Sequence, residues 1–349
     1  MGELDPRERE LRRRSFPHPR PTPYHLMLRT WDYAWWRPVV GVLVALVAFF
    51  VGASLIFLVV AALVALVQSG SYAHDVDATI SAAGGRGSVA APTLLALNLS
   101  LAAMIPITWA IVRWVHRLRP RWLGSVVPRL RWRFLLVCLL PAVVALLAQV
   151  VVSSLLPSGT GEQLSGSLNH FTTGTALSAL VVMLTTPLQA AGEEYLFRGY
   201  LTQAFGSVVR ARRAAQALAV LGPALIFALF HGFSQEPPIF FDRFAFGVVA
   251  GILVIRTGGL EAGIAMHVLN NFLAFGLALA FGDLTTALNA TGGSSWWMIL
   301  TTLTQSLVYL GLALWAARAF GLITTGPPVG GALPPAPGDP VLERQPPRV

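Results

Sequence analysis

The sequence predicts an all-α fold: a polytopic membrane bundle of about eight transmembrane helices. Of its 349 residues, 55% are hydrophobic and only 12% are charged, whereas about a quarter of the residues in soluble domains are charged. The chain also contains eight apolar runs close to the roughly 20 residues that a spanning helix needs. Its Arg residues gather in alternate connections between these runs, as in membrane proteins whose basic loops stay in the cytoplasm.

The apolar runs give the expected helices in order. They are residues 39–68, 92–112, 134–156, 173–191 and beyond, 214–233, 239–255, 260–281 and 296–316. The sixth run is the weakest, because Asp242 and Arg243 interrupt it near its start. The segment 1–38 is polar and Arg-rich, so no cleavable signal peptide is readable there. Aromatic residues near its end predict an interfacial lead-in to the first helix: Trp31, Tyr33, Trp35 and Trp36.

The charges set the expected orientation of the bundle. Eight Arg residues precede the first run, seven lie between the second and third, and three lie between the fourth and fifth. The opposite connections carry mostly acidic residues: Asp75, Asp77, Glu162, Glu236 and Asp283, beside Arg86 and Arg243. Because cytoplasmic loops hold the excess of basic residues, both termini are expected in the cytoplasm.

The chain divides into five expected segments. These are a basic cytoplasmic N-terminal segment (1–38), transmembrane helices 1–3 (39–168), a core of helices 4–7 (169–285), helix 8 (286–320) and a tail (321–349). Eight prolines follow Gly321, which prevents further helix and predicts a disordered cytoplasmic tail.

The composition excludes several kinds of chemistry. All 25 basic residues are Arg, which excludes Schiff-base lysines and the P-loop lysine. Cys138 is the one cysteine, so neither an intramolecular disulfide nor a cysteine-rich metal cluster is expected. The Arg residues lie beside apolar runs, which favours membrane orientation over nucleic-acid binding. The expected environment is therefore the lipid bilayer, and no nucleic-acid partner is expected.

Polar side chains inside the apolar runs are concentrated in the second half of the chain. Because a charged side chain in hydrocarbon costs about 3 kcal/mol, each ionisable one is a candidate functional residue. The set comprises Glu193, Glu194 and Arg198 at the end of the fourth run, His231 late in the fifth, and His267, Asn270 and Asn271 in the seventh.

Helical spacing places the two acidic residues of the fourth run on different faces of the helix. Glu194 and Arg198 are four residues apart with the acid first, so we expect an ion pair. Glu193 points to another face, and a carboxylate without a close cation is a candidate general base. Pro187 can kink this helix. Glu261, at the start of the seventh run, is expected to contact the helix dipole.

The same four-residue spacing predicts a neighbour for each of the two histidines. Phe227 lies four residues before His231 and can pack against its ring. His267 and Asn271 share a face of the seventh run, and both are donors suited to a developing oxyanion. A single histidine in a span can instead bond to a backbone carbonyl across the bundle, and Asn270 is expected to be structural.

Three motifs occur in order along these runs. Glu193–Arg198 fits E-E-x-x-x-R, Phe227–His231 fits F-x-x-x-H, and His267–Asn271 fits H-x-x-x-N. With this set the chain resembles the CPBP family, which includes the type II CAAX prenyl endopeptidases and bacteriocin-processing and immunity proteins. The resemblance covers about residues 173–281, and the other runs match by hydrophobicity alone.

The resemblance implies an intramembrane endopeptidase with its catalytic core at 169–285. Its substrate would be a membrane-associated protein or peptide, possibly one that carries a lipid such as a prenyl group. The implied roles are a water activated by Glu193 and His231, an oxyanion hole formed by His267 and Asn271, and a structural ion pair of Glu194 and Arg198. The Arg-only, Ala- and Gly-rich composition indicates a bacterial plasma membrane.

The candidate residues are also of the types that bind zinc, so zinc stays an alternative. Two histidines and a glutamate form many catalytic zinc sites, and here the ligands would be Glu193, His231 and His267. The H-E-x-x-H helix is absent, and the family has been described both as metalloproteases and as glutamate proteases that act without a metal. We expect no cofactor, with zinc as the alternative.

Two other functions stay open at this point. Acidic pairs relay protons in transporters, although paired repeats and broken helices at matching positions are not evident. A non-catalytic, immunity-type membrane protein would retain the motifs as scaffold. In the peptidase interpretation, His231 lies near the outer end of its run and His267 near the inner end of its own. Tilted or broken helices must therefore bring the two rings level.

Overall fold

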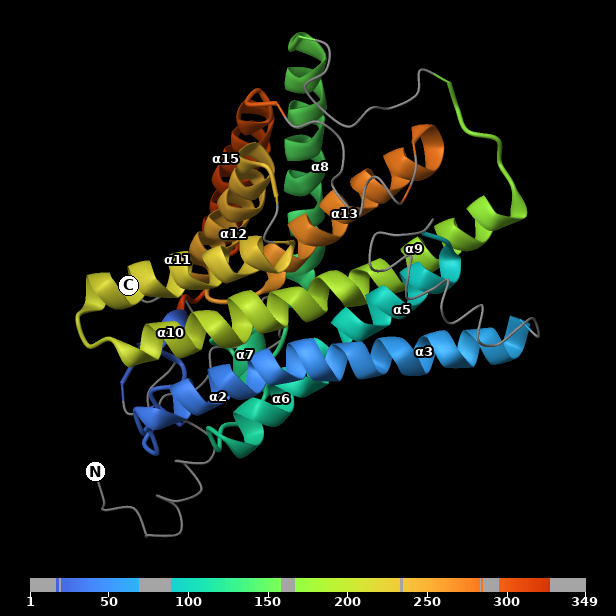
Figure 1. Cartoon of the computed structure of the whole chain (residues 1–349). Coiled ribbons are helices and arrows are strands. Elements are labelled where there is room, and N and C mark those ends of the chain that lie inside the picture. The colour runs from blue at the N-terminus through green and yellow to red at the C-terminus, as the bar shows by residue number, and fades with distance from the viewer. Residues whose placement is uncertain are drawn as a thin grey trace, which may run out of the picture.

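The computed structural model of the chain describes residues 17–18, 20–68, 89–157, 167–232, 235–282, 284 and 295–326. Eight helices in these ranges are long and apolar enough to cross a membrane (Figure 1). The predicted class, an all-α polytopic bundle, is therefore confirmed.

Several spans consist of more than one helical segment. The first span joins α2 (Trp36–Val47), a π-helical turn η2 (Ala48–Gly52) and α3 (Ala53–Gln68), and the second joins α5 (Ala91–Ala102) and α6 (Met104–Trp114). The fourth joins α9 (Thr173–Glu194), a π-helical turn η3 (Tyr195–Leu201) and α10 (Thr202–Val208). The others are α8 (Trp132–Leu155), α11 (Arg212–Phe230), α12 (Pro237–Thr257), α13 (Glu261–Phe281) and α15 (Met298–Ala319).

Three helix ends depend on particular side chains or turns. The fourth span continues to Val208 because the wider turn η3 carries the chain past the motif without a break. The sixth span begins at Pro237, a residue type suited to the first turn of a helix, and includes both charged residues. Asp242 pairs with Arg243 (Oδ2 to Nη1, 2.6 Å) and accepts a hydrogen bond from Thr302. The fifth ends at Phe230, earlier than expected, which makes His231 its capping residue.

The helix α13 lies in the centre of the bundle. It packs against α8 and α9, while α9 also packs against α5 and α8 against α15. The helix α12 contacts both α11 and α15. In Figure 1, α13 (orange) runs between the upright α8 (green) and the crosswise α9. Side chains on α13 therefore meet those of several spans.

The N-terminal segment packs against the bundle instead of only leading into it. His18, Tyr24 and Met27 are fully buried, and the Tyr24 hydroxyl donates a hydrogen bond to the carbonyl oxygen of Leu123 at the end of the short helix α7 (Arg121–Gly124). Arg29 reaches the carbonyl oxygen of Ser207 at the end of α10 (3.0 Å).

Residues 322–326 are ordered, although a disordered tail is expected from residue 321 onward. Strand β2 (Thr325–Gly326) pairs antiparallel with β1 (Thr22–Pro23), beside the 3-10 turn η1 (Tyr24–Leu26). Gly321 adopts a positive φ of 58°, which turns the chain back after α15. The rest of the tail, 327–349, lies outside the described residues, as do most of the acidic loop residues: Asp75, Asp77, Glu162 and Asp283.

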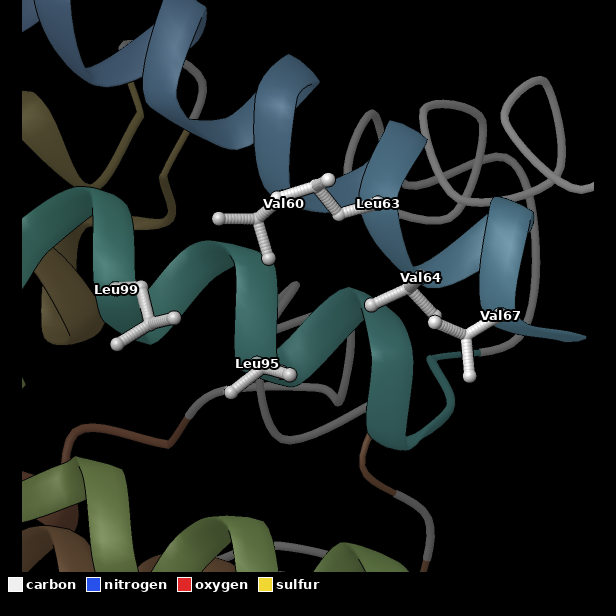
Figure 2. A pocket seen from close by; sticks show the side chains of 6 residues that line it. All are labelled: Val60, Leu63, Val64, Val67, Leu95 and Leu99. Carbon is white, nitrogen blue, oxygen red and sulfur yellow. The ribbon is translucent and has the colours of Figure 1, made fainter.

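A hollow of about 400 Å³ lies between α3 and α5 (Figure 2). Figure 2 shows six aliphatic side chains around it: Val60, Leu63, Val64, Val67, Leu95 and Leu99. Leu63 and Val67 are 57% and 84% exposed, so the hollow opens on a face that would contact lipid. Because its lining has no ionisable group, the chemistry must be sought elsewhere in the bundle.

Candidate active site

The first motif lies on α9, just before the π-helical turn. Glu193 and Glu194 are 5% and 0% exposed, although each carries a carboxyl group. Pro187 lies inside α9, and the helix continues through it to Glu194. The turn η3 then adds Arg198, which is 1% exposed. The helix therefore brings two carboxyl groups and one guanidinium into the protein interior.

Glu194 is the centre of a three-residue charge cluster. Its Oε1 atom lies 3.0 Å from Nη1 of Arg198 and 2.9 Å from Nδ1 of His267. The arginine comes from the next turn of the same span, and the histidine comes from α13. Burial of a charge is tolerated when a partner neutralises it, so this cluster joins α13 to the fourth span.

Glu193 faces a different set of partners. Its Oε1 atom accepts a hydrogen bond from Nε2 of Gln189 (2.7 Å), one turn earlier on α9. Its Oε2 atom lies 3.5 Å from Nε2 of His267 and, among the described residues, receives no hydrogen bond. The two adjacent glutamates thus differ in their partners: Glu194 pairs with the guanidinium of Arg198, and Glu193 bonds to the neutral amide of Gln189. The Oε2 atom of each lacks a hydrogen bond among the described residues.

His267 lies between the two carboxyl groups and is 4% exposed. Because Nδ1 lies beside the carboxylate of Glu194, this nitrogen donates, and Nε2 is directed toward Glu193. The approach of α13 requires Gly263, one turn earlier, since a Cβ atom at this position would lie 2.6 Å from Oε2 of Glu194. A small residue on α13 therefore permits the contact.

Aromatic rings surround the Arg198 guanidinium. Its Cζ atom lies 4.2 Å from the ring centroid of Phe227, 5.4 Å from that of Phe246 and 5.9 Å from that of Phe197. The face of an aromatic ring attracts a cation, most strongly where water is excluded. The ring of Phe227 also contacts His267, with centroids 6.1 Å apart, so this phenylalanine links all three motifs.

Asn271 lies one turn after His267 on α13. Its Nδ2 atom donates a hydrogen bond to Oε1 of Gln189 (3.0 Å) and so meets the first motif indirectly. The neighbouring Asn270 accepts from Nε2 of Gln305 on α15 (2.9 Å), in keeping with its expected structural role.

His231 occupies a different position from the other motif residues. It follows the last residue of α11, it is exposed, and its ring lies 4.6 Å from that of Phe227, in the predicted contact. Its Nδ1 atom lies 2.8 Å from the carbonyl oxygen of Phe227. In the described part of the chain no hydrogen bond or ion pair joins His231 to Glu193, so the imidazole in contact with Glu193 is that of His267.

The suggested zinc ligands do not fit a three-ligand site in this arrangement. Within the residues described, no group of three or more His, Cys, Asp or Glu side chains could hold a metal ion. His267 has both nitrogens directed at carboxyl groups, and the Nδ1 atom of His231 is bound to its own helix. We therefore derive no reaction step through zinc.

The sequence analysis missed Gln189, Phe246 and Gly263. Gln189 is four residues before Glu193, a spacing that places the two on one face of a helix and could have identified it. Gly263 is likewise four residues before His267. Phe246 has no such signal, because an aromatic residue in an apolar run is ordinary. The expected dipole contact of Glu261 is instead a two-pronged ion pair with Arg131, with distances of 2.7 and 2.9 Å.

The buried carboxyl, imidazole and amide groups of this bundle define an integral membrane protein with a polar site built from its fourth and seventh spans. Residues 172–273 match the model of the family "Type II CAAX prenyl endopeptidase Rce1-like". The chain thus carries an Rce1-like domain, and the resemblance inferred from the three motifs is confirmed.

A curated relative supports this assignment more weakly. The chain is 29% identical over 142 residues to the "Uncharacterized protein YyaK" of Bacillus subtilis (strain 168). The match covers 38% of this chain and 46% of that protein, so the chain spans about half the length of the relative. No solved structure matches the chain.

Proposed function

We propose that this protein is an intramembrane endopeptidase in which Glu193 is the general base that activates a water. The observation that carries the proposal is the contrast between the two glutamates. The Oε2 atoms of both glutamates are buried without a hydrogen bond, but among the described residues only Glu194 forms an ion pair with Arg198. The other oxygen of Glu193 accepts a hydrogen bond from the neutral amide of Gln189. A carboxylate oxygen of this kind can take a proton from water as the water attacks a peptide carbonyl.

The proposed reaction assigns the other motif residues as follows. A carbonyl oxygen that gains negative charge during attack is stabilised by donors, and we assign this role to His267 and the second Nδ2 hydrogen of Asn271. Since Nδ1 of His267 donates to Glu194, donation from Nε2 requires the imidazolium form, which has a proton on each nitrogen. We assign His231 to proton transfer beside Glu193. Its Nδ1 atom lies next to a carbonyl oxygen and so carries the proton, which leaves the Nε2 lone pair free. The proposal includes no metal or other cofactor.

The substrate and location form a further part of the proposal. The description of the matching family favours a membrane-associated protein or peptide, such as one with a prenyl group near its end. We place the protein in a bacterial plasma membrane with both termini in the cytoplasm. The pairing of β1 with β2 supports this arrangement, because it brings the two terminal segments to the same end of the bundle.

Terminal-peptide mass spectrometry of membranes tests the function. Membranes from cells with the wild-type protein should contain new peptide ends that are absent, or at least about 100-fold reduced, with Glu193→Ala. Asn270→Ala is the matched control, because Asn270 lies on α13 beside Asn271 but bonds to Gln305. It should preserve these ends.

Identical peptide ends in wild type and Glu193→Ala would overturn the peptidase proposal. In that case, vesicles that accumulate a solute under a pH gradient only with an intact Glu193 would indicate a proton-coupled transporter. Partner binding or protection that is unaffected by Glu193→Gln would indicate an immunity-type role.

A further inference from the structure

One glutamine connects two parts of the site that come from different spans. The amide of Gln189 donates from Nε2 to Oε1 of Glu193 (2.7 Å) and accepts at Oε1 from Nδ2 of Asn271 (3.0 Å). Gln189 is 5% exposed, so water competes little for either bond. A single planar group thus contacts both the proposed base and a proposed oxyanion donor.

The two hydrogen bonds of Gln189 orient the side chains of Glu193 and Asn271. A glutamine amide has its donor and its acceptor at opposite ends, so donation to Glu193 orients the oxygen toward Asn271. The bond to Oε1 sets the rotation of the carboxyl group and directs Oε2 toward Nε2 of His267 (3.5 Å). The bond to Asn271 uses one Nδ2 hydrogen and leaves the other for a substrate oxygen.

We propose that Gln189 is a positioning residue that aligns the base Glu193 with the oxyanion donor Asn271 through one amide group. The inference rests on the proposed function. The same side chain sets both reacting partners, so its loss changes the geometry of the attack. Because Glu193 and Asn271 occupy both polar ends of the Gln189 amide, its loss is expected to leave substrate binding unchanged.

A second glutamine provides an unusually close control. Gln305 is also 5% exposed and also forms an amide–amide hydrogen bond to α13, from Nε2 to Oδ1 of Asn270 (2.9 Å). Asn270 and Asn271 are adjacent, but the pair formed by Gln305 contacts neither glutamate in the described residues. Gln189→Met and Gln305→Met therefore each remove one amide–amide bond to α13, and only Gln189→Met also removes a bond to Glu193.

The test uses the full-length protein in lipid vesicles and an internally quenched peptide that spans a Glu193-dependent cleavage site found in the membrane experiment. Gln189→Met should lower kcat about 10- to 100-fold, the effect of losing a hydrogen bond to a charged group, with KM unchanged. Gln305→Met should preserve kcat. Gln189→Glu keeps the acceptor for Asn271 but cannot donate to Glu193 when ionised, so kcat should fall here too.

A double-mutant cycle separates positioning from general stabilisation. If Gln189 acts through Asn271, Gln189→Met should cost less kcat in an Asn271→Ala background than in the wild type. If Gln189→Met does not fold, the isosteric Gln189→Glu decides the question in its place. Wild-type kcat in the folded Gln189 variant, an equal loss in Gln305→Met, or fully multiplicative losses in the cycle would overturn the inference. Absence of any Glu193-dependent cleavage would instead overturn the proposed function, and this inference with it.

Discussion

The adjacent side chains of Glu193 and Glu194 have different polar partners, and this difference separates a proposed catalytic base from a structural ion pair. Glu194 binds Arg198 and His267, whereas Glu193 binds a neutral amide. Helical spacing in the sequence predicts the ion pair and the different direction of Glu193. It cannot predict that His267, from a helix some seventy residues later, lies between them.

The two glutamates should respond differently to the same substitution. Glu194→Gln leaves the buried guanidinium of Arg198 without its counter-charge, so we expect a loss of about 3–5 kcal/mol in the free energy of unfolding. Glu193→Gln preserves shape and removes no ion pair with Arg198, so its stability should stay near that of the wild type. Thermal unfolding in detergent measures both. Equal losses in the two variants would contradict the assigned division of roles.

Gly263 should tolerate no side chain. A methyl group at this position would lie 2.6 Å from Oε2 of Glu194, so Gly263→Ala should displace α13 and cost about 1–3 kcal/mol, with loss of cleavage. Gly276 on the same helix is the control, because a Cβ atom there meets nothing within 4 Å. The control should unfold at or above the wild-type temperature. Wild-type stability of Gly263→Ala would show that the two helices do not approach this closely.

At the level of elements, an irregular turn positions Arg198 and a helix end positions His231. The π-helical turn η3 carries Arg198 and begins directly after Glu194, and α11 ends just before His231. The apolar runs predict where spans lie, but they do not indicate a wider turn inside a span or the exact last residue of a helix. The family resemblance implies that His231 acts with Glu193 on a water, whereas the imidazole that lies 3.5 Å from Glu193 in the structure is that of His267.

The N-terminal segment should detach at low pH. Burial, followed by repulsion from Arg212 and Arg29, lowers the pKa of His25 from its ordinary 6.5 to about 4. Its folded form is therefore neutral, and between pH 6.5 and 4 the unfolded segment binds the additional proton. The stability of the docked segment should fall by about 1 kcal/mol for each pH unit in this window.

Hydrogen exchange of backbone amides 24–33 measures this effect after correction for the intrinsic pH dependence of exchange. His25→Phe should weaken the pH dependence, because the ring is then always neutral. Burial also lowers the pKa of His18, so a smaller dependence should persist in that variant. Protection that is constant from pH 7 to 4 in the wild type would contradict the docking described here.

The whole molecule is a bundle in which α13 joins the spans before and after it. Composition, run length and Arg placement predict this class and the eight spans from the sequence alone. The packing of residues 20–35 and the pairing of β1 with β2 could not be predicted, because short polar segments have no periodicity to indicate a partner.

The expected orientation can be tested with one introduced cysteine at a time, since the native Cys138 is fully buried and should not react. Asp32→Cys replaces an exposed residue of the N-terminal segment. Phe171→Cys replaces a 78% exposed residue in the connection before α9. A membrane-impermeant maleimide should label the second variant in intact cells and the first only after permeabilisation. The reverse pattern would contradict a cytoplasmic N-terminus.

The most direct test of the central claim is the cleavage rate of the purified protein in vesicles that contain a strong metal chelator. With the quenched peptide as substrate, the wild type should cleave at the same rate with and without the chelator, and Glu193→Gln should be folded but at least about 100-fold slower. A wild type that needs added zinc to regain activity, or a Glu193→Gln variant that cleaves at the wild-type rate, would contradict a metal-free reaction in which Glu193 activates the water.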